Sequence, residues 1–119
     1  MSFQSGMIKG IITKISNKIS KIAGGLDNIE ILFLKHKGEL YANAENKEGK
    51  KVNCSDMIGM DPKTALVVVK ILGGKGIHYD IARLKVSFPE GKLILFLKLI
   101  KINKDGEKET KLEHETIIE

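Results

Sequence analysis

The sequence predicts an α+β fold in which one antiparallel sheet carries two helices on one face. Residues 5–23 repeat their apolar side chains with the period of a helix. Asp61-Pro62 has the residue types that begin helices, and it precedes a second apolar segment. Three strand-like segments follow each helix. The expected order is therefore αβββαβββ, with two three-stranded meanders, and 119 residues suit a single domain over residues 1–119.

Residues 5–23 form the expected first helix. Its isoleucines fall within an arc of about 100° on a helical wheel, and lysines flank this stripe. Gly24-Gly25 supplies the left-handed end. Isoleucine is a modest helix former, so the stripe needs an apolar surface, either the sheet or a second copy of the chain. The side chains expected at a partner or dimer surface are Ile8, Ile11, Ile15, Ile19 and Ile22.

The first meander follows this helix. Ile29–Lys35 has few polar breaks, which predicts a strand covered on both faces. His36-Lys37-Gly38 makes a turn, and Glu39–Ala44 returns with Leu40 and Ala42 on one face. Residues 46–50 form a second turn before a short strand at residues 51–54.

The second helix is expected over residues 63–72, which are apolar almost all round. Asp61 is its N-cap and Pro62 its first residue, and Gly73-Gly74 ends it. The run Val67-Val68-Val69 has strand propensity, so a buried strand remains an alternative for this segment.

The second meander occupies the last third of the chain. Ala82–Phe88 alternates apolar and polar residues, as a strand with one buried face does. Pro89-Glu90-Gly91 turns the chain into Leu93–Ile102, which is apolar on both faces and is therefore expected to be central. Residues 107–118 have a strand-like alternation in which charged side chains occupy the odd positions, and this is typical of a protected edge strand.

Charge is distributed unevenly along the chain, whose net charge is +5. Residues 1–25 contain four lysines and no acid, whereas residues 105–119 contain six acids. We expect the basic first helix and the acidic last strand to lie near each other, within one subunit or across two.

Local motifs for catalysis, metals or cofactors are absent. The sequence has no GxSxG, HExxH, Walker lysine loop or paired CxxC, and its three histidines are far apart. Gly73-Gly74-Lys75-Gly76 is interpreted as a helix end, because a strand rather than a helix follows it. In an extended chain His78, Tyr79 and Asp80 point to alternating sides and do not converge. We therefore expect no local catalytic, metal or cofactor site, while an enzyme whose site is assembled from residues distant in the sequence remains a third alternative.

The lone cysteine, Cys54, excludes an intramolecular disulfide and a cysteine-based zinc site, and we expect it to behave as a small apolar residue on a strand. No segment has the length of a membrane span or the pattern of a secretory signal, which favours a cytoplasmic protein. The first helix has no Trp and a polar face of Ser, Thr and Asn, so binding to a membrane surface is not expected.

A basic nucleic-acid binder is the alternative function. Lysines gather around the first meander, and two more cations lie on the strand-like segment 82–88. Against this, the chain has a single arginine and few aromatic residues near the lysines. The expected phosphate contacts are Lys35, Lys37, Lys50, Lys51, Arg83 and Lys85.

Two hairpins resemble those of the roadblock type of regulatory dimer. Ile31-Leu32-Phe33-Leu34 followed by Lys37-Gly38-Glu39-Leu40 is similar to that family's first hairpin, as Arg83–Phe88 followed by Leu93–Ile102 is in the second half. The central helix is shorter than in that family, and the chain ends in a strand where the family has a helix. The resemblance concerns topology alone and implies no site residue. With no chemical motif, the expected function is a non-enzymatic interaction or regulatory module that forms a homodimer.

Overall fold

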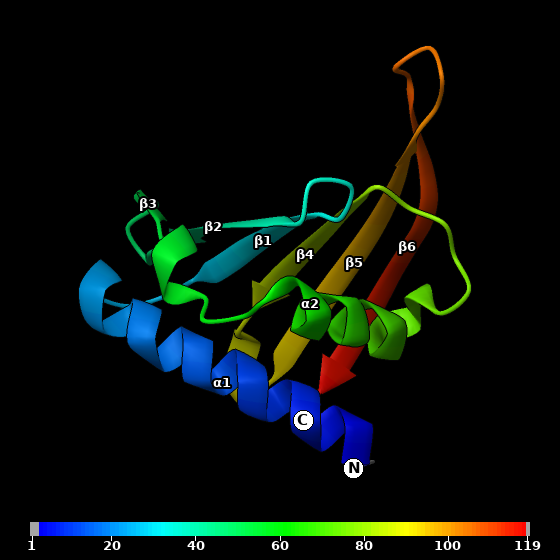
Figure 1. Cartoon of the computed structure of the whole chain (residues 1–119). Coiled ribbons are helices and arrows are strands. Elements are labelled where there is room, and N and C mark those ends of the chain that lie inside the picture. Colours follow the sequence, from blue (N-terminus) through cyan, green and yellow to red (C-terminus); the bar gives the residue numbers. More distant parts are fainter. Residues whose placement is uncertain (1–2, 119) are drawn as a thin grey trace.

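The computed structural model describes residues 3–118 and contains one six-stranded antiparallel sheet with both α-helices on the same face (Figure 1). This confirms the predicted α+β class and the order αβββαβββ. The elements are α1 (Phe3–Ala23), β1 (Asn28–Leu34), β2 (Glu39–Glu45), β3 (Lys51–Asn53), α2 (Pro62–Val69), β4 (Ile81–Ser87), β5 (Leu93–Ile102) and β6 (Lys108–Ile118).

The strand order is β3-β2-β1-β4-β5-β6, so the two meanders join where β1 pairs with β4. The register places Ile31 between Ala42 of β2 and Leu84 of β4. All three side chains are buried and face the helices. The β1–β4 seam therefore continues one apolar face across both halves of the chain.

Helix α1 lies across this apolar face and completes the core. Ile8, Ile12, Ile15 and Ile19 are each no more than 4 % exposed and belong to the same cluster as the helix-facing strand residues. The isoleucine stripe therefore packs on the sheet of its own chain. Burying such side chains is worth about 1.5–3 kcal/mol each, which offsets the modest helix propensity of isoleucine.

Helix α2 begins as predicted, because the Asp61 carboxylate accepts a hydrogen bond of 2.8 Å from the Thr64 N–H. The helix continues through Val69, and a wider helical turn follows over Lys70–Gly74. This excludes the alternative of a buried strand. Gly73, with φ of 114°, ends the helical segment in a conformation that favours glycine.

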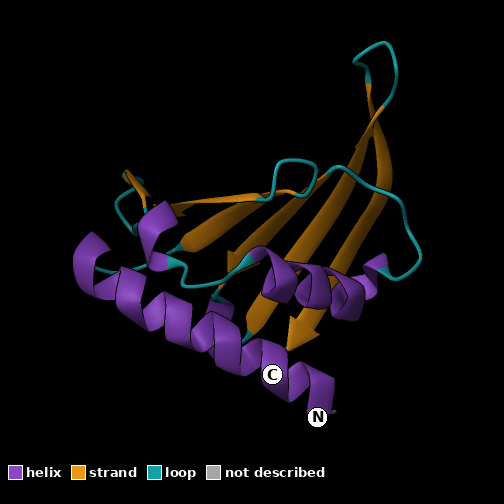
Figure 2. Ribbon diagram, viewed as in Figure 1, coloured by secondary structure: helices purple, strands orange, loops and turns teal. Residues whose placement is uncertain are grey.

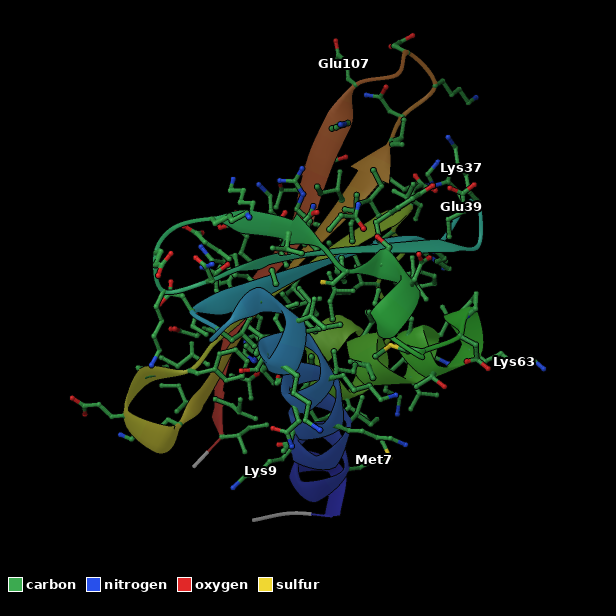
Figure 3. All side chains as sticks on the ribbon, turned by 90° about the vertical axis from the view of Figure 1, so that its left-hand side faces the viewer. Met7, Lys9, Lys37, Glu39, Lys63 and Glu107 are labelled. Atoms are coloured by element: carbon green, nitrogen blue, oxygen red, sulfur yellow. The ribbon has the colours of Figure 1, made fainter. Side chains whose placement is uncertain are left out.

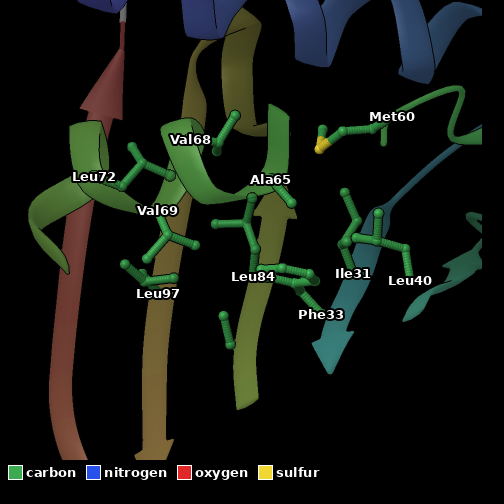
Figure 4. A pocket seen from close by; sticks show the side chains of 11 residues that line it. Ile31, Phe33, Leu40, Met60, Ala65, Val68, Val69, Leu72, Leu84 and Leu97 are labelled. Atoms are coloured by element: carbon green, nitrogen blue, oxygen red, sulfur yellow. The ribbon is translucent and has the colours of Figure 1, made fainter. Parts of the chain in front are cut away.

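Between α2 and the sheet lies a void of about 20 Å³ that is lined only by apolar side chains, including Phe33, Val68 and Leu84 (Figure 4). A space this small and apolar is a gap in the packing with room for no more than a water-sized molecule.

The β5–β6 hairpin extends beyond the rest of the sheet (Figure 2). Asn103 orders its turn, since its side-chain oxygen accepts hydrogen bonds from the N–H groups of Asp105 and Glu107. A register irregularity at Leu99/Ile100 separates this extension from the part of β5 that faces the helices.

One expectation is corrected. The few polar breaks in segment 29–35 predicted a strand covered on both faces, but the described helices cover only one face of the sheet. Segment 93–102, predicted to be central, is the interior strand β5, between β4 and β6. The other face, called here the open face, carries the remaining side chains of every strand.

Candidate interaction surface

The open face is arranged in rows that cross the sheet, because antiparallel pairing places partner residues side by side. Strand β4 contributes the basic residues, β5 mainly apolar ones and β6 the acidic ones. One complete row, from β2 to β6, consists of Tyr41, Leu32, Arg83, Lys98 and Glu113. The next row, in the same strand order, consists of Asn43, Glu30, Lys85, Phe96 and Glu115. A third row ends in Ser87, Ile94 and Ile117.

The half of the open face formed by β4–β6 exposes large apolar side chains. Phe96 is 39 % exposed and Ile117 is 57 % exposed, with Ile94 partly buried between them. Lys98 lies beside them and forms an ion pair of 3.8 Å with Glu113. This half is therefore an apolar strip with cations along one side and carboxylates along the other.

The other half of the open face is mostly polar and of mixed charge, although Leu32 and the 42 % exposed Tyr41 also lie on it. Glu30, Glu45, Lys51 and Lys85 line one shallow cleft, and Glu30 and Lys85 are directly paired positions on β1 and β4. Carboxylates thus alternate with the lysines here, which lowers the attraction of this area for phosphate.

The six cations expected to contact phosphate do not form one patch. Lys35 and Lys37 lie at the β1–β2 turn, and Figure 3 shows Lys37 beside Glu39. Lys50 and Lys51 lie at the opposite end of β2, which at about 3.4 Å per residue is roughly 20 Å away. Arg83 and Lys85 occupy the open face of β4.

The helix residues expected at a partner surface are also divided. Ile8, Ile15 and Ile19 are buried in the core, so the structure corrects their assignment to a surface. Ile11 is partly buried and lines a groove between α1 and α2 with Met7 and Val67. Of the five, Ile22 alone is largely exposed, at 61 %.

The oppositely charged ends of the chain meet only in part. The end of β6 reaches α1, where Ile118 is buried in the same cluster as Ile8 (Figure 1). Glu113 and Glu115, however, lie on the open face, away from α1. Glu107 lies at the far tip of the β5–β6 hairpin (Figure 3). The proximity expected from the charge distribution therefore holds for the backbone but not for these carboxylates.

A cluster of polar residues at the end of the sheet has a structural role. The Asp80 carboxylate accepts a 2.7 Å hydrogen bond from the Ile102 N–H and pairs with Lys101 at 3.3 Å. The Ile102 N–H, followed by Lys101, lowers the pKa of Asp80. Tyr79 is buried beneath Lys35, whose Nζ lies 4.6 Å from the centre of the ring. His78, Tyr79 and Asp80 line one pocket together with Lys35, His36 and Lys101, so the structure corrects the expectation that the first three do not converge. Within this pocket Asp80 and Tyr79 make separate contacts.

His36 and His78 line the same pocket as Asp80, whereas His114 and Cys54 lie elsewhere. His114 packs beside Gly73, and His36 lies within 3.2 Å of the Asp80 carbonyl oxygen. Over residues 3–118, no three histidine, cysteine or acidic residues gather in a way that could hold a metal ion. Cys54, which directly follows β3, is buried, and burial raises the pKa of its thiol.

The described helices include none with the length and apolar character of a membrane span. The departures from the roadblock topology are both present, since α2 has eight residues and the last described element is strand β6. No model of a known protein family matches the chain, and no curated protein matches its sequence.

Proposed function

We propose that this protein is a non-enzymatic interaction module that forms a homodimer through the open face of its sheet. The observation that carries the proposal is the covering of one sheet face only, with Phe96 and Ile117 left exposed on the other. Antiparallel sheets commonly keep one face in water, but that face is then polar along its strands. Here the open face of β5 and β6 instead presents a group of apolar residues.

The energetic gain from covering this surface is appreciable. At about 25 cal/mol per Å² of apolar area, burying what remains exposed of Phe96 and Ile117 is worth roughly 2 kcal/mol each. A second sheet fits such a face because stacked sheets pack about 10 Å apart with interleaved side chains. These gains support association rather than chemistry.

Nucleic-acid binding has less support as an alternative. The predicted lysines are separated along the strands, and carboxylates of β1, β2 and β6 share the open face with the cations. A phosphate backbone favours a surface of a single charge sign.

The proposal is tested by measuring mass in solution with two matched variants. Phe96→Lys places a charge on the open face, and Val67→Lys places the same charge on α2, where Val67 is 46 % exposed. Light scattering at about 500 µM protein, well above the expected dissociation constant, should give a mass close to that of a dimer for the wild-type protein and for Val67→Lys. Phe96→Lys should raise the dimer dissociation constant about tenfold or more, because a charge would be buried at the contact.

Circular dichroism checks that both variants fold. A wild-type protein that is monomeric at low and high salt would overturn the proposal. A dimer that Val67→Lys disrupts and Phe96→Lys does not would instead assign the interface to the helical side.

A further inference from the structure

We propose that the two copies stack with a two-fold axis running along β5, so that the basic strand of each faces the acidic strand of the other. This inference rests on the proposed dimer and adds the arrangement of its subunits. It follows from the order of charges across three neighbouring strands of the open face.

Strands β4 and β6 flank β5 at equal distances of about 4.8 Å. A two-fold rotation about an axis along β5 therefore brings β4 of one subunit over β6 of the other without changing the row. Arg83 then faces Glu113 of the partner subunit, since both residues share the row of Lys98. Lys85 likewise faces Glu115 of the partner subunit, since both share the row of Phe96. Each contact occurs twice, as an isologous interface requires.

The axis itself passes over the residues of β5. Phe96 and Ile94 meet their own copies there, which buries the exposed ring in an aromatic pair. Lys98 also faces its own copy, but its ammonium group lies 3.8 Å from the Glu113 carboxylate of the same chain. That carboxylate reduces the repulsion between the two lysines.

Two other ways of joining copies place like charges together. An axis across the strands would stack β4 on β4, with Arg83 and Lys85 facing the same two cations of the partner. Pairing the β6 edges around His114 would put Glu113 beside Glu115 of the partner subunit. Juxtaposed like charges disfavour both arrangements, whereas the axis along β5 pairs opposite charges.

The contact is small, which sets the concentration at which it forms. Three strands span about 14 Å, and a strand of β4's length spans about 24 Å. The area that these two lengths enclose is well below the roughly 800 Å² per partner of a standard interface. We therefore expect a dissociation constant of about 1–100 µM.

Exchanging the charges tests the arrangement. The first variant, Arg83→Glu/Lys85→Glu, makes both flanks of β5 acidic, and the second, Glu113→Lys/Glu115→Lys, makes both basic. Each should dimerise at least about tenfold more weakly alone, because like charges then face each other. An equimolar mixture should form a heterodimer, since every facing pair is again of opposite sign. The chain with all four substitutions should regain the wild-type homodimer.

Sedimentation velocity on each variant and on the mixture gives the constants. Asp105→Lys/Glu107→Lys, at the hairpin tip, controls for the change in net charge and should dimerise as the wild type does. If the wild type dimerises but the mixture and the four-fold variant do not recover, the axis along β5 is refuted while the dimer stands. If neither double variant weakens the dimer, β4 and β6 do not face each other, and an axis across the strands or β6 edge pairing replaces the axis along β5. A monomeric wild type removes both proposals.

Discussion

Asp80 joins three parts of the chain at the end of the sheet. Its carboxylate accepts a hydrogen bond from the Ile102 N–H and forms an ion pair with Lys101. Its carbonyl oxygen accepts a 2.9 Å hydrogen bond from the Lys35 N–H. The residue therefore connects β4 to β5 on one side and to the β1–β2 turn on the other. Lys101 is half exposed and adds little, so the backbone N–H is the principal partner of the carboxylate.

Asp80→Asn should lower the free energy of unfolding at neutral pH by about 1 kcal/mol, because the hydrogen bond from the Ile102 N–H loses its charge assistance and the ion pair with Lys101 is lost. The folded-state pKa of Asp80 lies below its unfolded value, so its contribution is present above the unfolded pKa of about 3.9. The contribution disappears as pH falls through the lower folded pKa. Urea unfolding of wild type and variant should therefore converge in acid. A difference that persists undiminished at low pH would contradict this role.

The hydroxyl group of Tyr79, unlike the carboxylate of Asp80, is buried without being paired in the described part of the chain. The ring is 6 % exposed, burial raises the pKa of its phenol, and its hydroxyl lacks a hydrogen-bond partner within the described part of the chain. An unpaired buried hydroxyl is costly, so Tyr79→Phe should raise the free energy of unfolding by about 1 kcal/mol. Thermal and urea unfolding measure the change. Tyr41→Phe is the control and should leave stability unchanged, since Tyr41 is on the surface, where its hydroxyl binds Glu39. A loss of stability in Tyr79→Phe would reveal a partner for the hydroxyl.

Residue-level prediction succeeded where the signal was local. Asp61 caps α2 because its side chain needs to reach only the third residue along the chain. The separate locations of the lysines were also accessible from the sequence. Lys37 and Lys50 belong to the turns at either end of the same predicted strand, so its length alone keeps them apart.

At the scale of elements, the end of α2 is fixed by a close approach to the sheet. A Cβ atom on Gly74 would lie 2.6 Å from Val69 Cγ1 and 2.9 Å from the Val69 carbonyl oxygen. The Leu99 side chain would be 3.1 Å away on the other side. The segment Gly73-Gly74 is therefore needed for packing, which agrees with its interpretation as a helix end rather than a phosphate loop.

Gly74→Ala should lower the free energy of unfolding by about 1–3 kcal/mol, because the backbone carbonyl of Val69 must move. Gly10→Ala provides the matched comparison. Gly10 lies inside α1, where an added Cβ would meet no atom within 4 Å apart from its chain neighbours and the backbone of its own helix. The same change there should raise stability by about 0.5–1 kcal/mol. Equal effects of both variants in chemical denaturation would contradict this account of the helix end.

The isoleucine stripe of α1 shows that the sequence of one helix does not determine which surface its apolar face packs against. Its period predicted an apolar face, and that face exists. Whether the face meets a sheet or a second copy depends on which surface the rest of the chain offers. Ile8, Ile15 and Ile19 are core residues because the alternating strands of both meanders build a continuous apolar surface beneath them.

At the scale of the whole molecule, the strand pattern predicted the fold class and the element order, whereas strand neighbours across the seam depend on distant residues. The alternation in Ala82–Phe88 assigned Leu84 and Val86 to the core. The same alternation assigns Arg83 and Lys85 to the opposite face. Their alignment with Glu113 and Glu115 emerges only once β5 is placed between β4 and β6.

The β1–β4 seam also has a consequence for how the chain folds. The hairpins of each meander are local, but the seam unites residues 28–34 with residues 81–87 and must wait until both are available. During synthesis from the N-terminus, β1 emerges long before its partner and offers a full seven-residue edge of unpaired backbone groups. The period between translation of β1 and β4 is therefore when the nascent chain is most prone to aggregate.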